Sequence, residues 1–145
     1  MTISELKAKE LDAALKLVWN VFLQYEAPEY SAEGVDEFRK SIDDPKFLAL
    51  LRTYGAFQDE RLVGVIATRS SGRHIALFFV DSAYQRQGIG NALFKRACKD
   101  DPGNTMTVNS SPYSVPVYHR LGFTDTDTEQ VTNGLRYTPM VCKIR

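Results

Sequence analysis

Residues 80–91 combine the end of an apolar strand, two closely spaced glycines and a fixed positive charge. The run reads Val80-Asp81-Ser82-Ala83-Tyr84-Gln85-Arg86-Gln87-Gly88-Ile89-Gly90-Asn91. If a helix begins near Gly88, its free N–H groups and its dipole attract an anion. Gly88 and Gly90 let the backbone approach a ligand closely, and the Arg86 guanidinium matches phosphate oxygens. The segment therefore predicts a phosphate cradle.

The same spacing also fits a tight strand-to-helix turn whose glycines serve packing alone. The segment has no Gly-Lys-Ser/Thr, which excludes a Walker loop. It also lacks the third glycine and the following acidic residue of the dinucleotide fingerprint. The glycines by themselves leave a ligand site and a structural turn both open.

A second segment downstream gives the first its context. Val108-Asn109 is followed by Val117-Tyr118-His119-Arg120-Leu121-Gly122-Phe123. In this order the two segments resemble the Gln/Arg-x-x-Gly-x-Gly/Ala signature and the Asn…Tyr-x-x-x-Gly-Phe segment of the GCN5-related N-acetyltransferases, the GNAT superfamily. The resemblance covers about residues 60–124, and the first 50 residues match only in the order of their elements.

The resemblance implies that acetyl-CoA lies in a V-shaped opening between the fourth and fifth strands. Backbone groups of Phe78, Phe79 and Val80 would pair with the pantetheine amides, as an added strand would. The residues implied to hold the pyrophosphate are Gln85, Arg86, Gln87, Gly88, Ile89, Gly90 and Asn91.

Asn109 would contact pantetheine or the acetyl region. The gap from Asn109 to Tyr118 is longer than the commonest family spacing, so Ser111 or Ser114 would share that role. Tyr118 is also implied to contact the cofactor.

Two roles fit Tyr118. The resemblance implies a general acid that protonates the leaving sulfur, with the carbonyl polarised by a backbone N–H near Val80. The residue type alone fits a core tyrosine that packs a helix against the sheet. A phenol has a pKa of about 10 and a thiol of about 8.5, so the proton transfer depends on position and burial.

A base is also needed, because a free amine with a pKa of about 10 is mostly protonated at neutral pH. Glu26 is the candidate that we select, with Glu29, His74 and Asp81 as alternatives. An ordinary solvated carboxylate at a helix end remains the other interpretation of Glu26 and Glu29.

In the family the region between the first two helices commonly forms the wall of the acceptor site. Aromatic and acidic side chains together suit a cation. The residues expected to bind the acceptor are Trp19, Phe22, Tyr25, Glu29 and Tyr30.

We therefore expect an N-acetyltransferase that moves the acetyl group of acetyl-CoA to a primary amine of a small molecule or peptide. Direct transfer in a ternary complex is favoured, since Cys98 and Cys142 lie outside both motifs. The alternatives are a non-catalytic acyl-CoA-binding sensor module, which would not need Tyr118, and an adaptor that pairs through an edge strand at residues 136–144. The acceptor stays open among a polyamine, an antibiotic, an amino acid and a protein N-terminus.

The elements that must position these residues can be read from periodicity and turn residues. Expected helices cover residues 9–26, 31–43, 88–99 and 114–122, and expected strands cover 3–6, 47–57, 62–68, 74–80, 105–108, 123–127 and 135–144. The strand at 105–108 follows a strand-helix unit and should pair parallel by a right-handed crossover. This order predicts one α/β domain over residues 1–145, with a GNAT-like mixed, mostly antiparallel central sheet flanked by helices on both faces.

Charge and composition argue against several classes of binding partner. Lys plus Arg and Asp plus Glu both number 18, so no nucleic-acid partner is expected. His74 and His119 stand far apart without a ligand cluster, so no metal is expected. No basic-then-apolar leader or membrane-length apolar run is visible, which predicts a cytoplasmic location without membrane contact. Sheet edges of this fold favour a homodimer by analogy.

Overall fold

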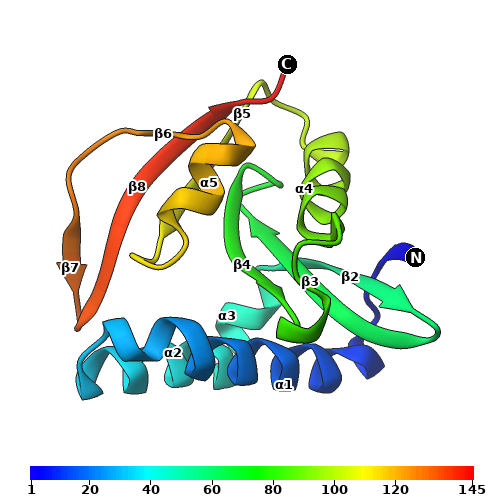
Figure 1. Cartoon of the computed structure of the whole chain (residues 1–145), viewed down its shortest axis with the longest axis horizontal. Helices are drawn as coiled ribbons and strands as arrows, with labels where there is room; N and C mark the ends of the chain where they lie inside the picture. The colour runs from blue at the N-terminus through cyan, green and yellow to red at the C-terminus, as the bar shows by residue number, and fades with distance from the viewer.

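A single sheet collects strands from nearly the whole chain in the computed structural model, which describes residues 1–145 (Figure 1). The strands are β1 (Thr2–Glu5), β2 (Arg52–Gln58), β3 (Arg61–Arg69), β4 (His74–Val80), β5 (Thr105–Ser110), β6 (Thr124–Asp125), β7 (Gln130–Thr132) and β8 (Leu135–Lys143). Their order is β1-β2-β3-β4-β5-β8-β6, and β7 pairs with β8. The β4–β5 pair is parallel and the other pairs are antiparallel, which confirms the predicted mixed sheet.

Helices cover both faces of this sheet. They are α1 (Leu11–Val21), α2 (Ala32–Asp43), α3 (Pro45–Ala49), α4 (Ile89–Asp100) and α5 (Val115–Leu121). One apolar cluster joins the sheet to α4 and α5, and a second joins it to α1 and α2. Strand β3 serves both clusters, since Ile66 belongs to the first and its neighbour Val65 to the second. The expected α/β class with helices on both faces is confirmed.

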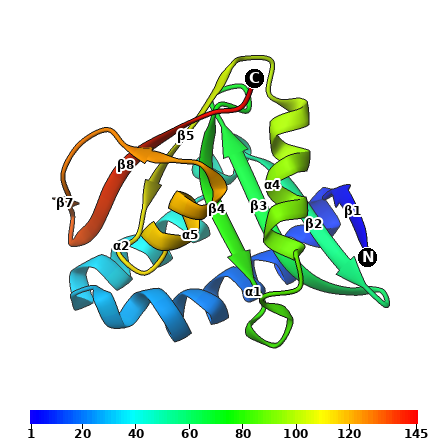
Figure 2. The same ribbon diagram turned by 45° about the horizontal axis from the view of Figure 1, so that its top comes forward.

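Strands β4 and β5 pair over a short stretch and then diverge. The parallel pairing joins His74 to Thr107 and Ile75 to Val108, whereas β4 continues to Val80. Figure 2 shows the two strands separating from this point. Beyond Ile75 the edge of β4 that faces β5 has no partner strand, so its backbone groups are free to pair with a ligand.

The first helix is shorter than the periodicity predicts. Instead of one helix over 9–26, a 3-10 turn at Ala8–Glu10 precedes α1, and a π turn at Phe22–Glu26 and a 3-10 turn at Ala27–Glu29 follow it. The Ala27 N–H donates to the Phe22 carbonyl, which gives the wider i to i+5 spacing. The extra residue in this turn changes the direction of the side chains that follow.

The expected strand over 47–57 is wrong in its first half. Pro45–Ala49 forms α3, because the Asp44 carboxylate accepts from the Lys46 N–H and Pro45 occupies the first helical position. Strand β2 begins only at Arg52. The apolar residues Phe47 and Leu48 thus belong to a helix that follows α2 directly.

The C-terminal strand β8 does not form a free edge. It pairs with β5 on one side and with β6 and β7 on the other. The expectation that residues 136–144 offer an open edge to a partner is therefore wrong. The predicted hairpin across Thr132-Asn133-Gly134 is present and joins β7 to β8.

Candidate functional site

Two cavities border the opening between β4 and β5. The first, of about 420 Å³, lies against the turn before α4 and is called the loop cavity below. The second, of about 430 Å³, lies between α2 and the β7–β8 hairpin and is called the hairpin cavity. Five residues line both cavities, and they are Glu26, Phe78, Phe79, Ser114 and Tyr118. A ligand in one cavity can therefore meet a ligand in the other at these side chains.

The loop cavity ends at the N-terminus of α4. Gly88 caps this helix with a φ of 81°, in the left-handed region that favours glycine, and Arg86 has a φ of 64°. The Gln85 side-chain amide donates to the Val80 carbonyl at 3.2 Å and holds the turn against β4. A Cβ at Gly88 would project into open space. The first N–H groups of α4 thus face a cradle that suits an anion.

Most of the expected cofactor residues line the loop cavity. They are Phe78, Phe79, Val80, Gln85, Arg86, Gly88, Ile89, Gly90, Asn91, Ser114 and Tyr118. Gln87 is exposed and lines neither cavity. Asn109 and Ser111 line the hairpin cavity instead, so their expected contact with pantetheine or the acetyl region stays a prediction. They lie there because β5 diverges from β4 and carries both residues away from the turn.

Sequence reasoning missed several residues of the loop cavity. Arg120, on α5, brings a second guanidinium to its wall, and Tyr84 lies beside the cradle. Tyr113 stacks on Tyr25 with ring centroids 5.1 Å apart, so the loop after β5 contacts the π turn across the cavity. The signal for Arg120 was its position two residues after Tyr118 in the second motif.

Tyr118 is nearly fully buried at the junction of the cavities, with 6% of its surface exposed. Its ring packs on Phe78 at 6.1 Å and edge-on against Phe123 at 5.2 Å. Burial, and then the negative charge of Glu26, raise the pKa of Tyr118 well above 10. The phenol is therefore protonated at neutral pH and can act as a donor.

Glu26 ends the π turn and lines both cavities. The residue is partly accessible to water, while its carboxyl lies among protein atoms. Burial raises the pKa of Glu26 to about 7, and the Ser111 side chain lowers it in part. A carboxyl with this pKa is partly ionised near neutral pH and can both accept and release a proton.

The other base candidates lie away from this junction. His74 is at the closed end of the β4–β5 pair, where Nδ1 lies 2.8 Å from Thr107 Oγ1, and burial lowers the pKa of His74 to about 4. Asp81 lies 3.6 Å from Arg61 in an ion pair. Glu29 is exposed. None of the three candidates lines the loop cavity or the hairpin cavity.

The aromatic residues of the first helix divide into two groups. Phe22 is fully buried and stacks on Phe38 at 3.9 Å, and Trp19 stacks on Phe22 at 5.6 Å. These two residues pack between α1 and α2 and line neither cavity. Tyr30 lines the hairpin cavity and Tyr25 the loop cavity.

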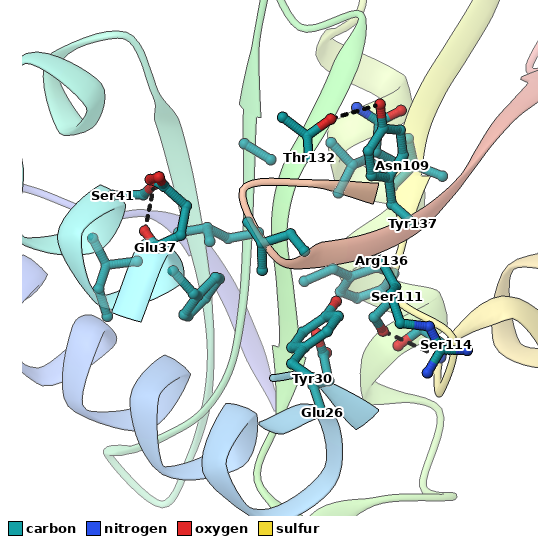
Figure 3. A pocket seen from close by; sticks show the side chains of 18 of the residues that line it. Glu26, Tyr30, Glu37, Ser41, Asn109, Ser111, Ser114, Thr132, Arg136 and Tyr137 are labelled. Atoms are coloured by element: carbon teal, nitrogen blue, oxygen red, sulfur yellow. Dashed lines mark hydrogen bonds between the residues drawn. The ribbon is translucent and has the colours of Figure 1, made fainter. Parts of the chain in front are cut away.

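The hairpin cavity takes its remaining walls from α2 and the β7–β8 hairpin. Figure 3 shows Glu37 and Ser41 on one side, Glu26 and Tyr30 on another, and Arg136 nearby. The Arg136 Nε and Nη2 donate to the Glu129 carboxylate at 3.2 and 3.3 Å, and Nη1 donates to the Glu29 carbonyl at 3.0 Å. Glu29, an expected acceptor contact, thus serves to fix Arg136.

Neither cysteine takes part in the site. Cys98 and Cys142 are free thiols that line neither cavity, and both pack in the apolar cluster under α4 and α5. Burial raises the pKa of Cys98 to about 11, which leaves it unreactive at neutral pH. No helix of the chain has the length and apolar character that crossing a membrane requires.

Comparison with protein families matches residues 26–144 to the acetyltransferase (GNAT) domain. This range contains the five residues that line both cavities, and it contains every strand except β1. No curated protein matches the sequence.

Several solved structures share the fold over nearly their whole length. A GCN5-related N-acetyltransferase from Rhodopseudomonas palustris superposes with a TM-score of 0.84 at 18% identity, covering 98% of this chain and 94% of that one. The PaiA N-acetyltransferase from Thermoplasma acidophilum, in complex with coenzyme A, superposes with a TM-score of 0.77 at 20% identity, and the match covers 99% of both chains. The ribosomal-protein-S18-alanine N-acetyltransferase from Escherichia coli superposes with a TM-score of 0.64 at 21% identity. That match covers 99% of this chain and 93% of the other.

Proposed function

The chain belongs to the acetyltransferase (GNAT) family, and from this premise we propose that it transfers the acetyl group of acetyl-CoA to a primary amine by direct transfer in a ternary complex. As an acetyl-CoA-dependent acyltransferase it must bring two substrates together. The observation that carries the proposal is the meeting of two cavities at Glu26 and Tyr118. The acceptor is a small molecule or a peptide, and a cytoplasmic location and a homodimer stay predictions from the sequence.

The loop cavity fits coenzyme A by its chemistry. The N-terminus of α4, with Arg86 and Arg120 beside it, offers N–H groups and two guanidinium groups to the pyrophosphate. The unpaired edge of β4 at Phe78 and Val80 offers backbone groups to the pantetheine amides. A Cβ at Gly88 would project into open space, which this proposal assigns to the phosphates.

Bound acetyl-CoA supplies an activated acyl group, so that a nitrogen–carbon bond forms as the carbon–sulfur bond breaks. Glu26 takes the proton that the attacking amine must lose, either directly or through water. Its pKa of about 7 supports this role. At neutral pH the carboxylate form is well populated, and it is a stronger base than an ordinary carboxylate. We therefore assign Glu26 as the general base.

Tyr118 gives a proton, or a hydrogen bond, to the departing sulfur. Its raised pKa keeps the phenol protonated, and the same burial disfavours a free thiolate beside it. The packing of the ring between Phe78 and Phe123 fixes the direction of the hydroxyl. The absence of a cysteine from both cavities supports direct transfer over a covalent enzyme intermediate.

The substitution Tyr118→Phe tests the assignment of the acid. We expect kcat to fall by about 10²- to 10⁴-fold while the Kd for acetyl-CoA changes by less than about threefold. Thiol release over a panel of amines measures the first quantity, and calorimetric titration of acetyl-CoA measures the second.

A Tyr118→Phe variant with full activity would show that another group protonates the sulfur. A wild-type protein that binds acetyl-CoA and acetylates no amine in the panel would contradict amine transfer itself. Such binding without turnover is what a sensor module would give.

A further inference from the structure

The hairpin cavity carries a net negative charge. Its acidic and basic side chains are the carboxyl groups of Glu26 and Glu37 and one guanidinium, Arg136. The Arg136 guanidinium is engaged by Glu129 through two hydrogen bonds and by the Glu29 carbonyl through a third. No cation of the wall is therefore free to bind an anionic group of an acceptor.

Glu37 has no partner of its own. It lies on α2 and is half-buried, and its carboxylate forms no ion pair or hydrogen bond. The cations of the same helix are already paired with other residues, Arg39 with Asp43 and Lys40 with Asp36, each at 3.0 Å. A partly desolvated carboxylate without a partner favours a ligand that brings a positive charge.

The space between the two carboxylates suits a short apolar chain. The cavity of about 430 Å³ is near the lower end of the range for small-molecule sites, about 300–1,000 Å³. Phe38, Phe47 and Tyr137 line it, and aromatic faces accept both methylene groups and cations. Figure 3 shows Glu37 and Glu26 on different sides of the cavity, and both residues line it.

We propose that the acceptor is a small diamine, with one amine at Glu26 for acetylation and the second held as an ammonium group by Glu37. This inference rests on the proposed function, because it names the acceptor of the same site. Glu37 is in this assignment a residue that determines specificity and takes no part in the proton transfers. The singly acetylated product has lost one positive charge, which weakens its binding.

The test compares α,ω-diaminoalkanes with n-alkylamines and ω-amino acids of the same chain length. We expect the wild-type protein to prefer the best diamine over its matched alkylamine by about 10- to 100-fold in kcat/KM. Glu37→Gln should reduce this ratio about 10-fold, mainly through the KM for the diamine. Glu37→Lys should shift the preference towards the ω-amino acid.

Glu33→Gln is the matched control, since Glu33 is an exposed residue of the same helix that lines neither cavity. It should leave the ratio of diamine to alkylamine unchanged, and calorimetry should give the same Kd for acetyl-CoA in all variants.

Acetylation of alkylamines and diamines at equal efficiency, or a diamine preference that survives Glu37→Gln, would overturn the diamine inference and leave amine transfer standing. Acetyl-CoA binding with no acetylation of any amine would overturn both, so the two failures are distinguishable.

Discussion

Glu26 and Tyr118 meet in one small space and have different protonation states at neutral pH. Burial raises the pKa of both side chains, but it brings Glu26 to about 7 and moves Tyr118 away from neutrality. The same physical cause thus leaves one group able to accept a proton and the other able to donate one. The negative charge of Glu26 contributes to the second effect, so the two residues are coupled.

The pH dependence of the reaction follows from the ionisation of Glu26. Only the carboxylate can accept a proton, so kcat/KM should rise with pH through about 7 and fall below it. Glu26→Gln should lower kcat/KM by about 10²- to 10⁴-fold and remove this step from the profile. Thiol release between pH 5.5 and about 9 measures both effects, because the substrate amine itself titrates near pH 10.

Glu29→Gln, at the exposed alternative candidate, is the matched control and should keep the step near pH 7. A Glu26→Gln variant that retains the step would assign it to another group.

Among the secondary-structure elements, the β7–β8 hairpin and α2 approach each other closely enough for their backbones to be in contact. An added Cβ at Gly34, inside α2, would overlap the Gly134 carbonyl oxygen at the hairpin turn. Gly134 has a φ of 80°, and a Cβ added there would lie 2.5 Å from the Gly34 backbone nitrogen. This close approach places the hairpin over the cavity, since Thr132 and Tyr137 line it from the two strands on either side of the turn.

Gly34→Ala should destabilise the protein, although alanine favours a helix over glycine by about 1 kcal/mol. The clash is with backbone atoms, which cannot rotate away, so we expect a net loss of about 1–2 kcal/mol and a higher KM for the acceptor. Urea unfolding gives the free energy, and calorimetry should show an unchanged Kd for acetyl-CoA.

Gly90→Ala is the comparison for stability, because its Cβ would make ordinary contacts at 3.6 Å or more. It should cost no stability. A stabilised Gly34→Ala would mean that the hairpin moves aside freely.

The whole molecule is organised around the opening in its sheet. The first 25 residues lie outside the family match and form β1 and α1, which close one side and one face of the sheet. The loop cavity draws its walls from β4, α4, α5 and the π turn, elements that are far apart in the sequence. A ligand that binds there connects them and should stabilise the folded state as a unit.

Acetyl-CoA at 100 times its Kd should therefore raise the free energy of unfolding by about 2.7 kcal/mol. For a chain of this size the midpoint Tm should rise by about 5–10 °C. Gly88→Asp puts a carboxylate into the anion cradle and should abolish both the shift and the calorimetric binding. Thermal unfolding with and without acetyl-CoA measures the effect, and the Tm of each variant without ligand is the reference. An equal shift in Gly88→Asp would place the phosphates elsewhere.

The sequence by itself determined the fold class, the strand-turn-helix around Gly88 and the inward face of α4. These features depend on local chemistry: glycine where φ is positive, apolar residues at helical spacing, and short polar turns between strands. It also identified Tyr118 and Glu26 as residues worth testing, the first through a motif and the second through its residue type and position.

Only the tertiary structure decided which side chains share a cavity. The π turn after Val21 breaks the helical phase that put Phe22 and Tyr25 on one stripe, and it brings Glu26 to the junction. The divergence of β5 moved Asn109 and Ser111 to the hairpin cavity. Glu37 gave no local signal, because its role depends on which cations of α2 and the hairpin are already paired. Burial and charge pairing are properties of the packed chain, so no spacing of residues within one element could have revealed them.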